Sequence, residues 1–225
     1  MAILWALIAA ALKWIVLFVV CFAAVMLLIV GIVKIVGRVK KSRPDFPVEG
    51  FAETPEYVKQ LSQLLCLLAD DDEQVVSSVG LFCKDKVAFG RKYLADMDYA
   101  DEDFANLDYW ILLVHALRSF GYLSYNDWKF SVEDALFNLA PVLAHYGLDG
   151  SLFDDIPDQY NIMMEEALPM IGAHMPEGYI LLDIYTGEDS YAITVASRET
   201  ALNAVSISDT MEKPLYNTGI HAVGV

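Results

Sequence analysis

The sequence predicts an α+β protein, mostly helical, in which one N-terminal transmembrane helix precedes a globular domain. Three observations predict this class. The first 43 residues contain six basic residues, no acidic residue and a long apolar run. The middle of the chain repeats apolar residues at the three- and four-residue spacing of amphipathic helices. Near the C-terminus this spacing becomes two, the period of a β-strand, so we expect about five helices packed on a small antiparallel hairpin or sheet.

The apolar run near the N-terminus predicts a membrane anchor. Residues 15–33 include neither a charged residue nor a proline. At about 1.5 Å per residue a helix of this length spans roughly 28 Å, close to the thickness of the hydrocarbon core. A cleaved signal peptide, the competing interpretation, requires a basic start and a shorter apolar core. We therefore expect an uncleaved transmembrane anchor within residues 1–36.

A basic cluster directly after this run predicts the orientation of the anchor. The cluster consists of Lys34, Arg38, Lys40, Lys41 and Arg43. By the positive-inside rule this flank stays in the cytoplasm, so we expect a single-pass protein of the cell inner membrane with its N-terminus outside. The same side chains are candidates for contact with lipid headgroups, although a topology signal alone also explains them. Residues 37–50, interrupted by Pro44 and Pro47, are expected to form a basic juxtamembrane linker.

The rest of the chain, residues 51–225, is predicted to form one acidic cytoplasmic domain. Residues 44–225 contain 31 acidic and nine basic residues, a net charge of −22. This charge excludes nucleic-acid binding, because phosphate recognition requires a basic surface. It favours a basic protein as the partner, because the field of the domain attracts positive charge.

The first two helices of this domain are predicted from their N-terminal residues. Thr54 is the expected N-cap of a helix that continues to Leu68, with Pro55 at its first position. The acidic run 70–73 is expected to begin a second helix whose apolar side extends to Val87. Acidic residues are favoured at a helix start because they interact with its exposed N–H groups, so we do not interpret this run as a metal site.

A second acidic cluster, residues 96–103, is expected to precede a third helix from Phe104 through Leu117 that ends at Gly121. If the cluster is read as an EF-hand from Asp96, it lacks the glycine and the glutamate required at the sixth and twelfth positions. No metal site is predicted there or elsewhere in the chain.

Two more helices are expected before the hairpin. Ser131 and Asp134 have the spacing of a capping box and predict a helix that ends at Gly147. The fifth helix is expected over residues 158–168, with Pro169 ending it.

The connection before the fourth helix is rich in aromatic residues. Tyr122, Tyr125, Trp128 and Phe130 lie close together in the sequence around Asp127. Two interpretations are open: an ordered connection packed into the core, or an exposed surface that binds a partner. In the second interpretation Tyr122, Tyr125, Asp127 and Trp128 are candidate partner-binding residues.

The C-terminal region is predicted to form the sheet. Residues 179–185 alternate in polarity, residues 186–190 are typical of a turn, and residues 191–195 continue as the return strand. A third strand is expected from residues 219–225, after a short helix over residues 199–205.

Polar residues gather around the predicted turn. Asp183, Thr186, Asp189 and Tyr191 are the candidate partner-binding residues of this region, although ordinary turn chemistry also explains such residues. Because the sequence contains no phosphate-binding loop, HExxH, GxSxG or CxxC motif, it predicts no cofactor.

The segments GYLSYNDWK, VEDAL and GYILLDIYTGEDSYAITV resemble a bacterial family described as a domain of unknown function (6630). The resemblance covers about residues 53–205, and its most specific part is the hairpin from Leu182 to Tyr191. It implies no catalytic residue, because no activity is assigned to the family. The predicted anchor lies outside the resemblance, which implies that this member is tethered.

Two functions from different classes agree with these features. The first is a membrane-tethered acidic domain that binds a basic protein, such as an immunity-type protein that binds a basic toxin. The second is a membrane-anchored hydrolase that uses acidic residues of the C-terminal hairpin. The sequence does not predict the oligomeric state.

Overall fold

The computed structural model describes most of the acidic domain and none of the predicted anchor. The described residues are 53–127, 129–156, 164–186, 189–211 and 219–223. They all belong to Val48–Val225, the second of two units into which the chain divides. The predicted span, residues 15–33, and the basic cluster after it lie outside them. Among these residues no helix is both long enough and apolar enough to cross a bilayer.

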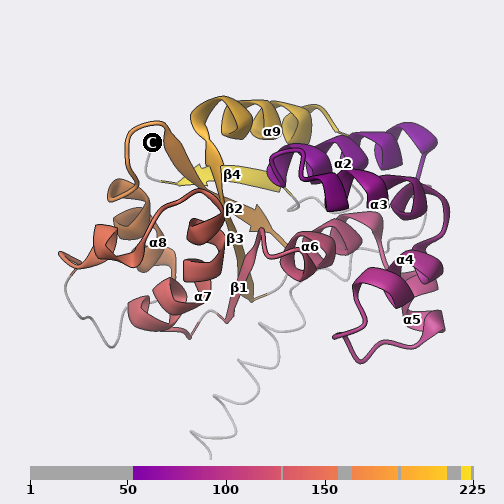
Figure 1. Cartoon of the computed structure of the whole chain (residues 1–225), viewed down its shortest axis with the longest axis horizontal. Helices are drawn as coiled ribbons and strands as arrows, with labels where there is room; N and C mark the ends of the chain where they lie inside the picture. Colours follow the sequence, from indigo (N-terminus) through magenta and orange to yellow (C-terminus); the bar gives the residue numbers. More distant parts are fainter. Residues whose placement is uncertain (1–52, 128, 157–163, 187–188, 212–218, 224–225) are drawn as a thin grey trace, which may run out of the picture. The chain divides into compact units, whose positions relative to one another are not determined.

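A four-stranded antiparallel sheet with the order β1-β3-β2-β4 lies at the centre of the fold (Figure 1). Its strands are β1 (Ser124–Asp127), β2 (Tyr179–Tyr185), β3 (Ser190–Ser197) and β4 (Gly219–Val223). The predicted hairpin and third strand are confirmed, and the third strand pairs with β2. Strand β1 was not predicted, because four residues are too few for an alternating pattern to stand out from the aromatic connection.

Eight α-helices surround the sheet within the described ranges, against about five that were predicted. They are α2 (Pro55–Leu68), α3 (Glu73–Lys84), α4 (Lys86–Tyr93), α5 (Asp101–Asn106), α6 (Tyr109–Ser119), α7 (Val132–His145), α8 (Met164–Ala173) and α9 (Arg198–Thr210), with a short 3₁₀ helix, η1 (Gly150–Phe153). The protein is therefore α+β and mostly helical, as predicted.

Two of the additional helices arise because two aspartates each split a predicted helix, and α9 corresponds to the short helix that was expected separately over residues 199–205. Asp85 ends α3, and its Oδ1 accepts a hydrogen bond of 2.9 Å from the backbone N–H three residues later, at the start of α4. Asp108 separates α5 from α6, and its Oδ1 accepts one of 2.7 Å from the N–H two residues later. The apolar spacing continues across both positions, so the pattern predicted one helix where each N-cap starts a new one.

Other helix ends follow the predicted caps more closely. Thr54 Oγ1 accepts a hydrogen bond from the N–H of Tyr57 at the start of α2, and Ser131 and Asp134 form the predicted capping box of α7. Pro169, however, does not end the fifth helix: it lies inside α8. A proline inside a helix removes one backbone hydrogen bond, and here the helix continues past it to Ala173. Residues 158–163 of this prediction lie outside the described residues.

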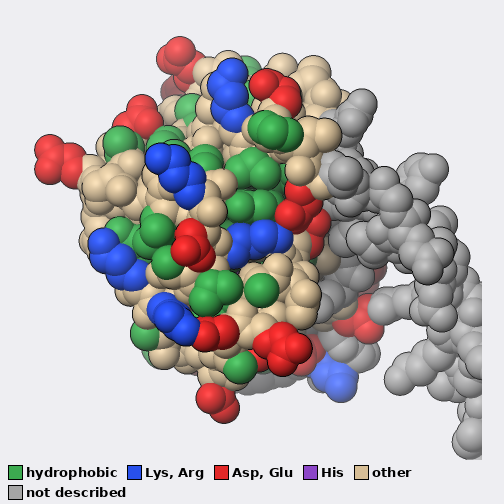
Figure 2. Space-filling view, turned by 90° about the vertical axis from the view of Figure 1, so that its right-hand side faces the viewer, with side chains coloured by type: hydrophobic (Ala, Val, Ile, Leu, Met, Phe, Trp, Pro, Cys, Tyr) green, Lys and Arg blue, Asp and Glu red, His purple; other side chains and the backbone are tan. Residues whose placement is uncertain are grey.

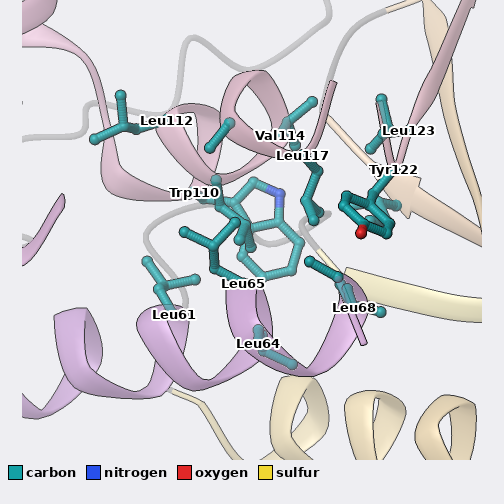
Figure 3. Close-up of a cluster of buried hydrophobic side chains, with 14 of the residues drawn as sticks. Leu61, Leu64, Leu65, Leu68, Trp110, Leu112, Val114, Leu117, Tyr122 and Leu123 are labelled. Carbon is teal, nitrogen blue, oxygen red and sulfur yellow. The ribbon is translucent and has the colours of Figure 1, made fainter. Parts of the chain in front are cut away.

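The larger core lies on the face of the sheet that α2, α6 and α9 cover. Trp110 of α6 is fully buried at its centre, between leucines of α2 and the end of α6 (Figure 3). Its Nε1 donates a hydrogen bond of 3.2 Å to the carbonyl oxygen of Tyr185, at the end of β2. This bond gives the indole a polar partner while its rings fill the core.

A second core lies on the opposite face of the sheet, under α7, η1 and α8 (Figure 1). Strand residues Leu181, Ile193 and Val195 point into it. The even-numbered residues of β2 point into the larger core, so both faces of the hairpin are buried. Gly172 of α8 allows close packing here, since a Cβ at this position would lie 2.8 Å from the carbonyl oxygen of Val223 in β4.

Candidate functional site

The strand register brings polar side chains together on the α7–α8 face of the sheet. Residues opposite each other in antiparallel strands point to the same face. Asp183 lies opposite Ile193, a residue of the second core, and opposite His221 of β4. Tyr191 lies opposite Tyr185 and Asn126, next to this row. We call the following group the polar end of the α7–α8 face: Ser124, Asn126, Asp183, Tyr185 and Tyr191 of the strands, with Asn138 of α7 and Glu165 of α8.

Asn126 connects β1 to α7 within this group. Its side chain is fully buried, and its Nδ2 donates a hydrogen bond of 2.8 Å to Ser124 Oγ. Its Oδ1 accepts a hydrogen bond of 3.0 Å from Nδ2 of Asn138. A buried amide needs such partners to compensate for the loss of water. These bonds therefore fix the edge strand β1 against α7.

Asp183 is the unusual member of the polar end. Its Oδ1 is shielded from solvent and accepts no hydrogen bond from any residue that the structure describes. Burial raises the pKa of the Asp183 carboxyl to about 6, because removal from water disfavours the charged form. Such a carboxyl exchanges its proton near neutral pH, and its shielded oxygen is an acceptor for a cation or a hydrogen-bond donor.

Tyr191 lies near two carboxylates. Burial, and then the negative charges of Glu165 and Asp183, raise the pKa of Tyr191 to about 12. Its phenol therefore stays protonated at neutral pH and remains a hydrogen-bond donor. The polar end thus combines a carboxyl that titrates near neutrality with a neutral phenol.

Other predicted residues lie on the opposite face of the sheet. The hydroxyl of Tyr125 and Ser190 Oγ are 2.7 Å apart, and Ser190 Oγ is 3.3 Å from Thr186 Oγ1. The guanidinium of Arg118 lies over the Tyr125 ring, 5.5 Å from its centroid. These contacts attach the hairpin to β1 and α6.

The remaining predicted residues are dispersed. Tyr122 is buried and stacks on His145 with ring centroids 4.3 Å apart, which agrees with the core interpretation of the aromatic segment. Asp127 is exposed at the end of β1 and accepts a hydrogen bond of 3.1 Å from the backbone N–H of Lys129. Asp189 is exposed after the turn, and Trp128 lies outside the described residues. Of the seven predicted partner-binding residues that the structure describes, Asp183 and Tyr191 alone lie together at the polar end.

Sequence reasoning missed Ser124, Asn126 and Asn138. A signal was present, since Ser124 and Asn126 are two residues apart and such spacing places both on one face of a strand. The aromatic residues between and around them instead predicted a buried connection or an exposed binding surface.

Charge is distributed unevenly over the molecule. Residues 130–197 contain 12 acidic residues and no Lys or Arg. We call this segment, which forms α7, η1, α8, β2 and β3, the acidic side. Its exposed acids are Glu133, Asp134, Asp149, Asp154, Asp155, Glu165, Glu166, Glu177 and Asp189.

The side formed by α3, α4 and α5 has a mixed charge. Figure 2 shows Lys and Arg there, interspersed with Asp and Glu. Lys86 Nζ lies 2.9 Å from Glu53 Oε2, and Arg91 pairs with Asp101. Salt bridges of this kind neutralise charge locally, whereas the acidic side has no basic side chain of its own other than histidine.

In the part of the chain that the structure describes, no group of three or more His, Cys, Asp or Glu side chains is placed to hold a metal ion.

No curated protein matches the chain, and no solved structure matches it. The model of the family described as "Domain of unknown function (DUF6630)" matches residues 59–216, from within α2 to beyond α9. This match spans well over half of the chain and includes the hairpin on which the sequence resemblance was based. The chain therefore belongs to the DUF6630 family.

Proposed function

We propose that this protein is a single-pass, membrane-tethered acidic domain that binds a basic protein. The observation that carries the proposal is the absence of Lys and Arg from residues 130–197, which contain 12 acidic residues. At ordinary composition a segment of this length contains about eight Lys and Arg. Mixed charges are the usual state of a protein surface, and the α3–α5 side has them. The acidic side thus suits a basic partner.

The physics of this association favours rapid and selective capture. A surface of one sign raises the association rate of an oppositely charged protein and repels proteins of its own sign. A basic toxin that meets its immunity protein at the inner membrane is a partner class with this charge. Tethering at the membrane would place the acidic domain where such a protein enters the cytoplasm.

Crosslinking and affinity capture of the full-length protein from native membranes test the proposal, with two matched variants. The double variant Glu133→Lys/Asp155→Lys reverses two exposed charges on the acidic side. The double variant Asp98→Lys/Glu102→Lys reverses two exposed charges on the α3–α5 side. Each pair consists of one residue in the first turn of a helix and one outside any helix, and each changes the net charge equally.

We expect a stoichiometric basic partner at about 0.1 M salt that is lost at about 1 M, where the screening length falls from about 10 Å to about 3 Å. The Glu133/Asp155 variant should capture much less of it than the Asp98/Glu102 variant. Equal capture by both variants, or a partner retained at high salt, would contradict the proposal. The proposed topology has a separate test: a reporter fused after Val225 should be active only on the cytoplasmic side.

A second candidate function, the membrane-anchored hydrolase, is favoured by one observation at the polar end. The Asp183 carboxyl is shielded, and its pKa of about 6 suits a general acid or base. On this proposal Asp183→Asn abolishes hydrolysis of a panel of chromogenic esters, phosphoesters and glycosides while the fold is retained. Asp154→Asn, at an exposed position outside the hairpin, should leave the rate unchanged. Full activity of the Asp183 variant, or no activity of the wild type, would refute the hydrolase.

A further inference from the structure

Helix α7 has an apolar stripe on each of two opposite sides. Its inner stripe packs into the second core and consists of Val132, Ala135, Leu139, Val142 and Leu143. Its outer stripe consists of Phe137, Ala140, Pro141 and Ala144, and all four are exposed. Their spacing of three, four and seven residues from Phe137 is the spacing with which an amphipathic helix contacts a partner. A surface helix that packs only on its own core typically has charged and polar residues on this side.

Phe137 is the most exposed large hydrophobic side chain among the described residues, at 79%. Pro141, one turn later on the same stripe, has no N–H, so the carbonyl oxygen of Phe137 lacks its usual donor four residues on. Aromatic residues of this kind are the usual anchors of protein interfaces.

Acidic residues lie before and after the outer stripe in the sequence. Glu133 and Asp134 lie one turn before Phe137, and Asp149 follows the end of α7. Asp154 and Asp155 come directly after η1, the 3₁₀ helix that contacts α7. Each of these five carboxylates is exposed, and the closest Lys or Arg before α7 in the sequence is Lys129.

We infer that the outer stripe of α7 is the docking face for a basic amphipathic helix of the partner protein. This inference rests on the proposed function, whose partner it specifies. The apolar side of the partner helix covers Phe137, Ala140 and Ala144, and its flanking Lys and Arg side chains reach the carboxylates at the two ends of the stripe. The small alanines permit close approach of the two helices.

Charge selects this occupant over two others. A second copy of the chain would bring acidic side chains against the same acidic side chains, since a symmetric interface repeats one surface on both subunits. A membrane with anionic lipids would be repelled by the carboxylates around the stripe. A basic helix is attracted by them, and it also buries Phe137.

The test measures binding of a synthetic probe to the full-length protein in lipid nanodiscs. The probe is a fluorescent helical peptide with leucines along one side and lysines on both flanks, and a matched peptide replaces the lysines with glutamates. Phe137→Ala is compared with Leu202→Ala, because Leu202 of α9 is also a largely exposed hydrophobic residue, at 59%, outside the acidic side. Since both side chains are exposed, neither substitution should disturb folding.

We expect the lysine peptide alone to bind, with its dissociation constant raised about tenfold or more by Phe137→Ala and changed by no more than about twofold by Leu202→Ala. A photocrosslinker at Ala140 should attach to the lysine peptide, and one at Leu202 should not. Equal effects of the two alanine variants, binding of the glutamate peptide, or no binding to the wild type would overturn the docking face. The capture experiment on native membranes decides the proposed function separately.

Discussion

The replacement Asp183→Asn should stabilise the protein at neutral pH. Asparagine has nearly the same shape as aspartate but carries no charge, so it removes the unfavourable burial of a carboxylate in the folded state. The pKa of Asp183 rises from 3.8 to about 6 on folding. A difference of one in pKa corresponds to about 1.36 kcal/mol, so the buried charge lowers the free energy of unfolding by about 3 kcal/mol at pH 7.

The sign follows from proton binding in the two states. Between about pH 4 and pH 6 the folded protein retains a proton on Asp183 that the unfolded chain has released. The contribution of Asp183 to stability therefore decreases as the pH rises through this window. Below it, aspartate is neutral in both states and resembles asparagine.

Urea denaturation of the full-length protein in detergent, followed by near-ultraviolet circular dichroism, measures this effect. The difference between wild type and variant at about pH 7 should exceed the difference at about pH 4 by up to about 3 kcal/mol. Comparison across pH cancels any constant effect of the new amide group. Asp189→Asn, at an exposed position, is the control substitution. A difference that is equal at both pH values would refute the assignment of Asp183 as a buried titrating group.

Three further substitutions test packing and capping by urea denaturation of the same preparation. Gly90→Ala places a Cβ 2.4 Å from the ring of the buried Phe104 and should cost about 1–3 kcal/mol, whereas a neutral outcome would show that this contact is loose. Lys86→Met leaves the Glu53 carboxylate, partly buried and 2.9 Å from the Lys86 ammonium, without its cation and should cost about 1–3 kcal/mol, whereas an unchanged stability would show that this ion pair contributes nothing. Ser131→Ala removes the capping box of α7 and should cost about 1 kcal/mol, and Ser131→Asn should restore most of it.

Local signals predicted the helices well because they depend on neighbours in the sequence. The capping box at Ser131 and Asp134 fixes the start of α7 through bonds within a single turn. The breaks at Asp85 and Asp108 were missed because apolar side chains on both sides of each break pack into the same core. Periodicity reports which residues face the core, and it does not report whether the backbone between them is continuous.

The face on which Asp183 lies could not be predicted. In β2 both Leu181 and Leu182 are fully buried, because helices cover the two sides of the sheet. Alternation of polarity marks a buried face only when the other face meets water. Beyond the hairpin, the neighbours of Asp183 depend on the pairing of β2 with β4 and on α8, and neither is encoded in the hairpin itself.

Folding explains some of the acidic residues of the acidic side, but it does not explain why Lys and Arg are missing from it. Asp134 and Asp149 cap helices, and Glu165 and Glu166 lie in the first turn of α8, where negative charge stabilises the helix. These roles explain why acids occur at such positions. They do not explain why the segment lacks Lys and Arg, which elsewhere in the domain lie beside similar acids, as Arg91 does beside Asp101. Mutual repulsion among neighbouring carboxylates opposes compaction. An acidic surface that folding does not require is the feature that supports the proposal of a basic partner.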